Sequence, residues 1–246
     1  MVEVQTLGSE EGKEVVVLHG TPVPPESVEQ ITQGLIEDYR VYVVDYCGLG
    51  VDPQETVRRI EEALVAEGVE KPAIVGHSFG AYHAFQLATG DGVEVTGIAA
   101  IGPLAYLPDE VKAGYEELAQ GIEAGVVDLA DALLDGWFSA AYQEENPQIV
   151  DTLRRWFDEL GDEALCRAAR VDSIGEDLRP TLGAIDVPVY LCVGELDGAT
   201  PPEWSEEIAE LLPRAELDVV EGVGHFPHFE EREETVASIR EFLGSL

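Results

Sequence analysis

A serine flanked by glycines stands between an apolar run and a stretch with helical character. The segment Gly76-His77-Ser78-Phe79-Gly80 follows Ala73-Ile74-Val75 and precedes residues 81–88, which read as a helix. Between a strand and a helix, a G-x-S-x-G motif makes a strained turn that presents the serine hydroxyl, and the two glycines let strand and helix approach closely. The motif therefore predicts that Ser78 is a nucleophile, although so short a pattern also arises by chance.

An activated serine needs a base within hydrogen-bond reach and an acid that orients the base. In hydrolases built on this turn, the acid and then the histidine follow the serine along the chain. Asp197 lies in a loop after the apolar run 187–193, and His225 follows the strand candidate 217–220. Both positions come just past the carboxyl end of a predicted strand, where open parallel sheets bind ligands. The order predicts a triad of Ser78, Asp197 and His225.

Each partner of the serine also has a purely structural interpretation. An aspartate in a glycine-rich loop is usually a turn or helix-capping residue. Of the five histidines, His19 and His77 are expected to hydrogen-bond loops, and His83 is expected to pack within a helix. His228 competes with His225 for the role of base. We favour His225 because it directly follows a glycine-flanked strand end.

Acyl transfer also needs hydrogen-bond donors aimed at the oxyanion that develops on the substrate. The N–H of Phe79, the residue after the nucleophile, is the first candidate. The second is expected from the loop 19–25, which follows the apolar run 15–18. Pro22 has no N–H to offer, so Thr21 is the candidate. The alternative is that this loop is only a stiff connection into the next helix.

Together these segments resemble the α/β-hydrolase fold superfamily over nearly the whole chain. The resemblance rests on His19-Gly20, Asp45 with Gly48 and Gly50, the segment 76–80, the segment 194–197 and Gly224-His225. It implies a serine hydrolase of the kind found among esterases, lactonases, carbon–carbon bond hydrolases and cofactor-free haloperoxidases. Members that use an aspartate nucleophile are disfavoured by Ser78. The loop after Asp45 departs from the family because it lacks the serine or threonine common after the second glycine.

Between Pro103 and Ile185 the apolar residues recur at helical spacing, which predicts amphipathic helices. They are Val111, Tyr115, Leu118 and Ile122, then Leu129, Leu133 and Trp137, and then Ile149, Leu153, Trp156 and Phe157. Most should pack on the main domain, and Trp137 and Trp156 are candidates to line a substrate pocket. The segment more faintly resembles the 3-oxoadipate enol-lactonase branch, in Trp137-Phe138 and Asn146-Pro147 among others. The His19-Gly20 turn differs from the turn usual in that branch.

Five arginines in the same segment are the other candidates for binding a substrate. They are Arg154, Arg155, Arg167, Arg170 and Arg179. One of them could grip a substrate carboxylate through a bidentate fork. Pairing within helices with Asp158, Glu159 and Glu163 is the interpretation that we favour.

The remaining chain alternates between predicted strands and helices, which implies an α/β fold with a mostly parallel central sheet covered by helices on both faces. Strands are expected at 2–7, 14–18, 40–45, 73–77, 95–101, 187–193 and 216–220, and helices at 26–37, 53–67, 80–89, 203–212 and 231–243. Residues 1–103 and 182–246 would form the core domain, and 104–181 an inserted helical cap. Few residues precede the strand 14–18, so the N-terminal antiparallel strands should be short or reduced to one hairpin.

The charge balance and the cysteine content indicate which partners and which cellular compartment to expect. The 246 residues include 50 acidic and only 14 basic side chains, a formal net charge of -36. Nucleic acid and anionic membranes demand the opposite sign and are excluded as partners. The acidic, lysine-poor composition resembles that of proteins from salt-accumulating halophiles. Three scattered cysteines indicate neither a disulfide framework nor a zinc site, and the lack of a signal segment or apolar span predicts a cytoplasmic protein.

These observations predict a serine hydrolase that cleaves a small carboxylic ester or lactone through an acyl-enzyme, with no metal or organic cofactor. A cofactor-free perhydrolase or haloperoxidase, or a carbon–carbon bond hydrolase, would use the same triad. A ligand-binding receptor on a hydrolase scaffold is the alternative without catalysis, because a fold does not determine a function. The sequence leaves open whether the chain acts alone or as a homodimer.

Overall fold

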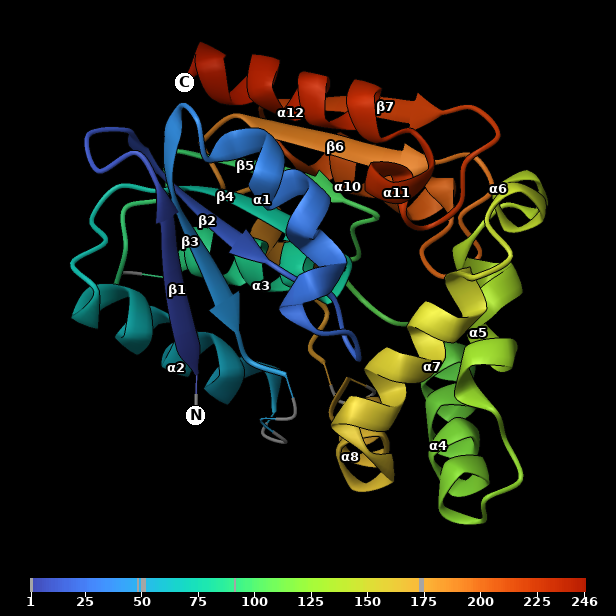
Figure 1. The fold of residues 1–246 in the computed structure, drawn as a ribbon. Coiled ribbons are helices and arrows are strands. Elements are labelled where there is room, and N and C mark those ends of the chain that lie inside the picture. The colour runs from blue at the N-terminus through green and yellow to red at the C-terminus, as the bar shows by residue number, and fades with distance from the viewer. Residues whose placement is uncertain (1, 48, 50–51, 91, 173–174) are drawn as a thin grey trace.

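The computed structural model describes residues 2–47, 49, 52–90, 92–172 and 175–246. Gly48 and Gly50, which contribute to the family resemblance, lie outside these residues. A seven-stranded sheet with the order β1-β3-β2-β4-β5-β6-β7 forms the centre (Figure 1). Its strands are β1 (Glu3–Gly8), β2 (Lys13–Leu18), β3 (Tyr39–Asp45), β4 (Ala73–His77), β5 (Gly97–Ile101), β6 (Val189–Gly194) and β7 (Ala215–Val220). The prediction of a mostly parallel α/β sheet is confirmed, and each strand overlaps its predicted range.

The central strands are apolar throughout because helices cover both of their faces. In β2, the side chains of Val16 and Leu18 join one apolar core, and those of Val15 and Val17 join a second core on the opposite face. All four are buried. Successive side chains of a strand point to opposite faces, so an unbroken apolar run is what a doubly covered strand requires.

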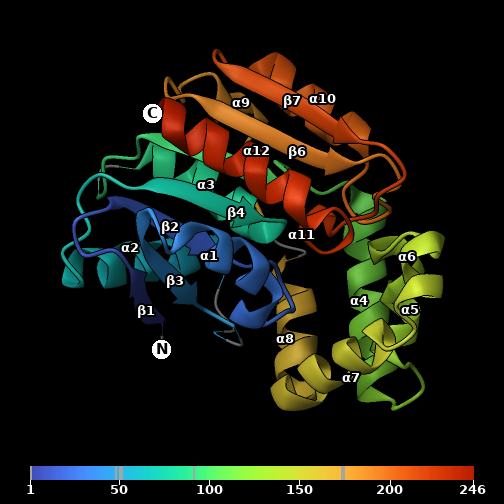
Figure 2. The same ribbon diagram turned by 45° about the horizontal axis from the view of Figure 1, so that its top comes forward.

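The helices form a layer on each face of the sheet (Figure 2). Helices α2 (Pro53–Ala66), α3 (Phe79–Thr89), α9 (Arg179–Leu182) and α10 (Pro202–Leu211) pack on one face, and α1 (Glu29–Leu35) and α12 (Arg232–Ser245) pack on the other. A short 3-10 helix, η1 (Pro25–Val28), precedes α1. The start of α2 is encoded locally, because the Asp52 carboxylate accepts a hydrogen bond from the Glu55 N–H at 2.9 Å and Pro53 occupies the first turn.

The N-terminal edge differs from the predicted hairpin. Strand β1 pairs antiparallel with β3, from Glu3 opposite Asp45 to Gly8 opposite Arg40, and not with β2, which follows it in the chain. Strand β2 has no free edge, because β3 and β4 occupy both of its sides. The antiparallel part of the sheet is therefore the single strand β1.

Five helices between β5 and β6 lie together beyond the carboxyl ends of the strands (Figure 1). They are α4 (Asp109–Glu123), α5 (Leu129–Trp137), α6 (Ala140–Glu145), α7 (Ile149–Leu160) and α8 (Asp162–Asp172), and we call them the α4–α8 segment. A third apolar core holds this segment together and includes Trp156, Val23 and Phe226. Val23 and Phe226 lie outside the segment, so this core also joins it to the loops at the end of the sheet. Within the described residues, no helix is both long and apolar enough to cross a bilayer.

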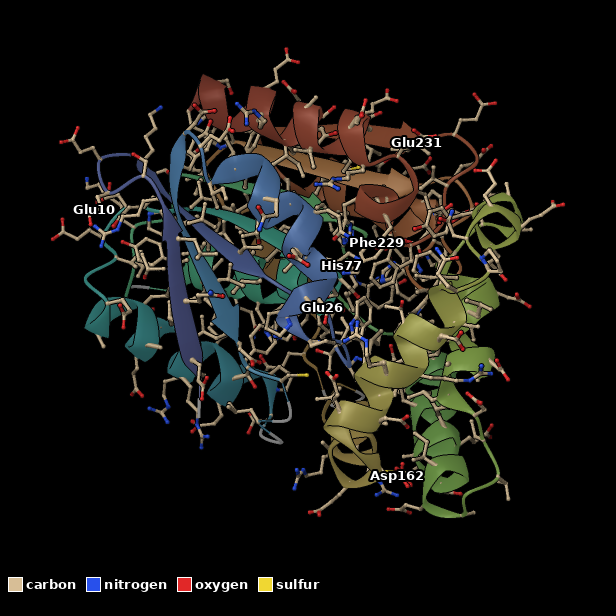
Figure 3. All side chains as sticks on the ribbon, viewed as in Figure 1. Glu10, Glu26, His77, Asp162, Phe229 and Glu231 are labelled. Atoms are coloured by element: carbon tan, nitrogen blue, oxygen red, sulfur yellow. The ribbon has the colours of Figure 1, made fainter. Side chains whose placement is uncertain are left out.

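Acidic side chains project outward around the molecule, among them Glu10, Asp162 and Glu231 (Figure 3).

The five arginines between 154 and 179 all contact carboxylates, as we favoured, but several of these pairs join different elements. Arg170 of α8 reaches Glu116 and Glu123 of α4. These side chains are substantially exposed, and an exposed ion pair contributes only about 0–1 kcal/mol. So few pairs cannot offset the repulsion within a chain of charge -36.

We predict that salt stabilises the protein. Raising KCl from about 0.1 M to about 1 M shortens the screening length from about 10 Å to about 3 Å, which removes most repulsion between neighbouring carboxylates. The melting temperature should rise throughout this range in a thermal denaturation series. A parallel series in sulfate controls for general salting-out. A flat or falling melting temperature in KCl would show that the acidic surface is compensated locally.

Candidate active site

Ser78 occupies a strained turn between β4 and α3. Its backbone angles are φ 55° and ψ -121°, and among the described residues it alone combines a positive φ with a side chain. A Cβ atom on Gly76 would come within 2.5 Å of the Gly80 carbonyl oxygen, and one on Gly80 would come within 2.3 Å of the Leu18 oxygen. Only glycine fits at these two positions. The turn therefore has the geometry that the motif predicts.

The loop after β2 lies directly beside this serine. Strands β2 and β4 are neighbours at the point where the strand order reverses, the usual ligand site of an open α/β sheet. A Cβ atom on Gly20 would lie 3.1 Å from the Ser78 Cβ atom, so the glycine permits this close approach. In the loop itself, the ring nitrogen Nδ1 of His19 lies 2.6 Å from the Gly20 carbonyl oxygen.

Asp197 and His225 meet at the ends of β6 and β7. The Nδ1 atom of His225 lies 2.7 Å from the Asp197 Oδ2 atom, and both side chains are buried. The second carboxylate oxygen accepts hydrogen bonds from the N–H groups of Ala199 at 2.9 Å and Thr200 at 2.7 Å. An ionised carboxylate only accepts hydrogen bonds, so His225 carries its proton on Nδ1. Its Nε2 atom is then free to act as a base.

Thr200 is a contact of this pair that the sequence did not reveal. Its hydroxyl lies 2.9 Å from Asp197 Oδ2, 3.0 Å from the Gly102 carbonyl oxygen and 3.2 Å from His225 Nδ1. The available signal was local, since a hydroxyl residue three positions after an aspartate is typical of a side chain that bonds its own turn. The same bonds that make Asp197 a turn residue also fix the orientation of its carboxylate.

The main chain of His225 is held from both sides. Its N–H donates to the Trp137 carbonyl oxygen at 2.8 Å, and its own carbonyl oxygen lies 3.0 Å from Nε2 of His77. Burial, followed by the neighbouring histidines, holds the pKa of His77 well below its ordinary value, so this ring is neutral. It must donate from Nε2 to reach a carbonyl oxygen. The His77 side chain is buried, and Figure 3 marks its position.

His228, the competing candidate for the base, lies elsewhere. It is buried, and its Nε2 atom lies 2.9 Å from the Ser27 carbonyl oxygen. Burial lowers its pKa to about 3. His83 packs within α3, where burial lowers its pKa to about 4. Of these three histidines, the structure brings only His225 to Asp197.

A cavity of about 330 Å³ opens at Ser78 and His225. Trp137 also lines it, whereas Trp156 lies outside, in the core of the α4–α8 segment against Phe229. Apolar side chains of α4, α5 and α8 form much of its wall, among them Val111, Leu118, Ile122, Leu129, Leu133 and Leu165. No aspartate, glutamate, lysine or arginine is among the described lining residues. Val111 and Tyr115 of α4 pack against the core of the main domain, as expected, and also line this cavity, whereas none of the five arginines reaches it.

The two candidate oxyanion donors, Thr21 and Phe79, belong to the same cavity. Among the described residues, neither N–H has a hydrogen-bond acceptor. Phe79 is the first residue of α3, and the first N–H groups of a helix have no intrahelical partner and carry partial positive charge. Both are therefore able to donate to an oxyanion.

The described residues contain no group of three or more histidine, cysteine, aspartate or glutamate side chains arranged to hold a metal ion.

Sequence and fold comparisons agree with this architecture. The model of the alpha/beta hydrolase family matches residues 15–238, and the chain belongs to this family. It is 25% identical to a pimeloyl-[acyl-carrier protein] methyl ester esterase of Vibrio campbellii, over 94% of this chain and 95% of that protein. A thermophilic esterase from Thermogutta terrifontis superposes with a TM-score of 0.90 at 22% identity, over 99% of this chain and 93% of that chain. An enol-lactonase from Burkholderia xenovorans gives a TM-score of 0.87 at 21% identity, over 99% and 96%.

Replacing His225 by alanine should lower kcat far more than replacing His228 by alanine. His225→Ala should lower kcat by about 10³-fold or more, the scale of losing a triad member. His228→Ala removes a ring that touches neither Asp197 nor the cavity, so kcat should change by less than about tenfold. The kcat of both variants is measured with an ester substrate, and their melting temperatures are the control for folding. Similar losses in two folded variants would contradict the assignment of His225 as the base.

Proposed function

We propose that this protein is a serine hydrolase that cleaves a small carboxylic ester or lactone through an acyl-enzyme intermediate. The observation that carries the proposal is the 2.7 Å hydrogen bond between Asp197 and His225, at a cavity that Ser78 also lines. The esterases among its relatives and the family membership support the same reaction class. Ser78, Asp197 and His225 are the proposed catalytic residues.

Each residue has a defined role in the proposed reaction. His225 Nε2 takes the hydroxyl proton of Ser78 as the serine oxygen attacks the substrate carbonyl carbon, and Asp197 stabilises the imidazolium that forms. The N–H groups of Thr21 and Phe79 donate to the oxyanion of the tetrahedral intermediate. Collapse of this intermediate expels the alcohol, which receives the proton from His225. Water then attacks the acyl-serine by the same steps and releases the acid.

Residues 104–181 act in this proposal as a helical cap on the core formed by residues 1–103 and 182–246. Support comes from the cavity, whose walls combine side chains of α4, α5 and α8 with Ser78 and His225. Trp137 is the proposed aromatic contact of the substrate. The apolar walls would exclude water from the acyl group and strengthen the hydrogen bonds to the oxyanion.

A fluorophosphonate probe tests the nucleophile directly. It should label one equivalent of the native protein at Ser78, because the reagent forms an adduct only with an activated serine. Ser78→Ala should abolish both labelling and the hydrolysis of p-nitrophenyl esters and small lactones. Mass spectrometry of the labelled peptide identifies the site, and Ser205→Ala, which alters a serine outside the cavity, is the matched control.

Native protein that is folded at high salt yet neither reacts with the probe nor hydrolyses any ester or lactone would contradict the proposal. That outcome would favour a receptor on a hydrolase scaffold.

A further inference from the structure

We propose, on the basis of the proposed function, that the substrate places an uncharged, apolar acyl group in the cavity between α4, α5 and α8. Of the described residues that line this cavity, only Thr21, Ser78, Tyr115, Thr200 and His225 carry hydroxyl or imidazole groups, and Trp137 and Trp204 add an indole N–H each. Ser78 and His225 are the reacting pair, and Thr200 is bonded to Asp197. The side chains that α4, α5 and α8 contribute to the walls are mainly aliphatic.

The cavity adjoins charged side chains without including them among its described walls. Ile122, Leu129 and Leu165 line it and also line a second hollow of about 430 Å³ that contains Asp128 and Arg154. These three side chains therefore separate an apolar cavity from a polar one. In that second hollow, Arg154 contacts Asp128, Asp131 and Asp151, so this arginine is already engaged by carboxylates.

A carboxylate at the end of the acyl group would lose its hydration here without gaining a partner, and a buried ion without a partner is costly. The net charge of -36 adds a long-range repulsion of anionic substrates. Salt screens the long-range repulsion but scarcely affects the cost of burying the carboxylate. The same reasoning disfavours the enol-lactone of a dicarboxylic acid, whose second carboxylate would have to enter the apolar walls.

Methyl hexanoate and monomethyl adipate form a matched pair of substrates, because they differ only in a terminal carboxylate. We expect kcat/KM to be at least about 100-fold higher for methyl hexanoate. Most of this preference should persist when KCl is raised from about 0.1 M to about 1 M. Equal turnover of both esters, or a preference that salt abolishes, would overturn the inference. Hydrolysis itself would still stand, so failure of this inference is distinguishable from failure of the proposed function.

Ala169 tests whether the acyl group occupies this space. It lies on α8 and lines the cavity, whereas its neighbour Ala168 does not. Ala169→Leu should shift the preference among p-nitrophenyl ethanoate, butanoate, hexanoate and octanoate toward shorter chains, and Ala168→Leu should leave it unchanged. Leu165→Ala, which enlarges the same cavity, should shift it toward longer chains even if Ala169→Leu fails to fold. An unchanged preference in a folded cavity variant would overturn the placement.

A different set of contacts carries a second inference, which concerns Glu230 at the end of α11 (Pro227–Glu230). Its carboxylate accepts hydrogen bonds from the N–H of Gly224 at 3.0 Å and from the N–H of Ser139 at 3.1 Å. Gly224 precedes His225, and Ser139 follows α5. Burial raises the pKa of the Glu230 carboxyl, against the effect of these bonds.

The last residues of α5 touch both catalytic loops. The Trp137 carbonyl oxygen accepts from the His225 N–H at 2.8 Å, and the Gly136 carbonyl oxygen accepts from the Gly198 N–H at 3.0 Å. Glu230 holds this stretch against the His225 loop through Ser139. We infer, again on the basis of the proposed function, that Glu230 is a positioning residue that keeps His225 aligned with Asp197 by binding the α4–α8 segment to the His225 loop.

Glu230→Ala should lower kcat roughly tenfold or more, because small displacements of a catalytic group are costly, while KM changes little. Glu230→Gln keeps an acceptor oxygen and should restore most of kcat, whereas Glu230→Asp, shorter by one methylene, should not. Glu231→Ala alters the exposed neighbour and should match the native protein. A folded Glu230→Ala variant with native kcat, or a Glu230→Gln variant no better than Glu230→Asp, would overturn the inference. Each variant is compared with native ester turnover, which separately tests the proposed function.

Discussion

The hydrogen bond between Asp197 and His225 is the contact on which the arrangement of the site depends. It joins the loops after β6 and β7, and its two partners are 28 residues apart in the chain. Most contacts nearby serve to hold it: the N–H groups after Asp197 bind the second carboxylate oxygen, and His77 holds the main chain of His225. An aligned acid and base need such support, because a small error in orientation removes most of the catalytic benefit.

The acidic and basic side chains of the surface are kept apart from the cavity beside Ser78. The chain has a net charge of -36, and the described walls of the cavity beside Ser78 contain no aspartate, glutamate, lysine or arginine. The α4–α8 segment contributes to both properties, since its arginines pair with carboxylates outside while its aliphatic side chains face the cavity. The number of charged residues on the surface can therefore change without changing the side chains that line the cavity.

What the sequence predicted was encoded locally. The turn at Ser78 requires glycines at fixed offsets, and the central strands of the sheet are apolar runs, so both could be predicted without tertiary information. The pairing of β1 could not, because it depends on which strand edge is left free. The contacts of Thr200 with Gly102 and His225, and that of Glu230 with Ser139, form only on folding. The α4 residues at helical spacing marked a buried face, but spacing cannot distinguish packing from the lining of a cavity.

The central claim is that hydrolysis passes through an acyl group on Ser78, and partitioning between water and added methanol tests it most directly. Esters with the same acyl group and different alcohols would share one acyl-enzyme, so phenyl and p-nitrophenyl hexanoate should give the same ratio of methyl hexanoate to hexanoic acid at a given methanol concentration. A product ratio that depends on the leaving alcohol would show that no common acyl-serine forms and would contradict the account.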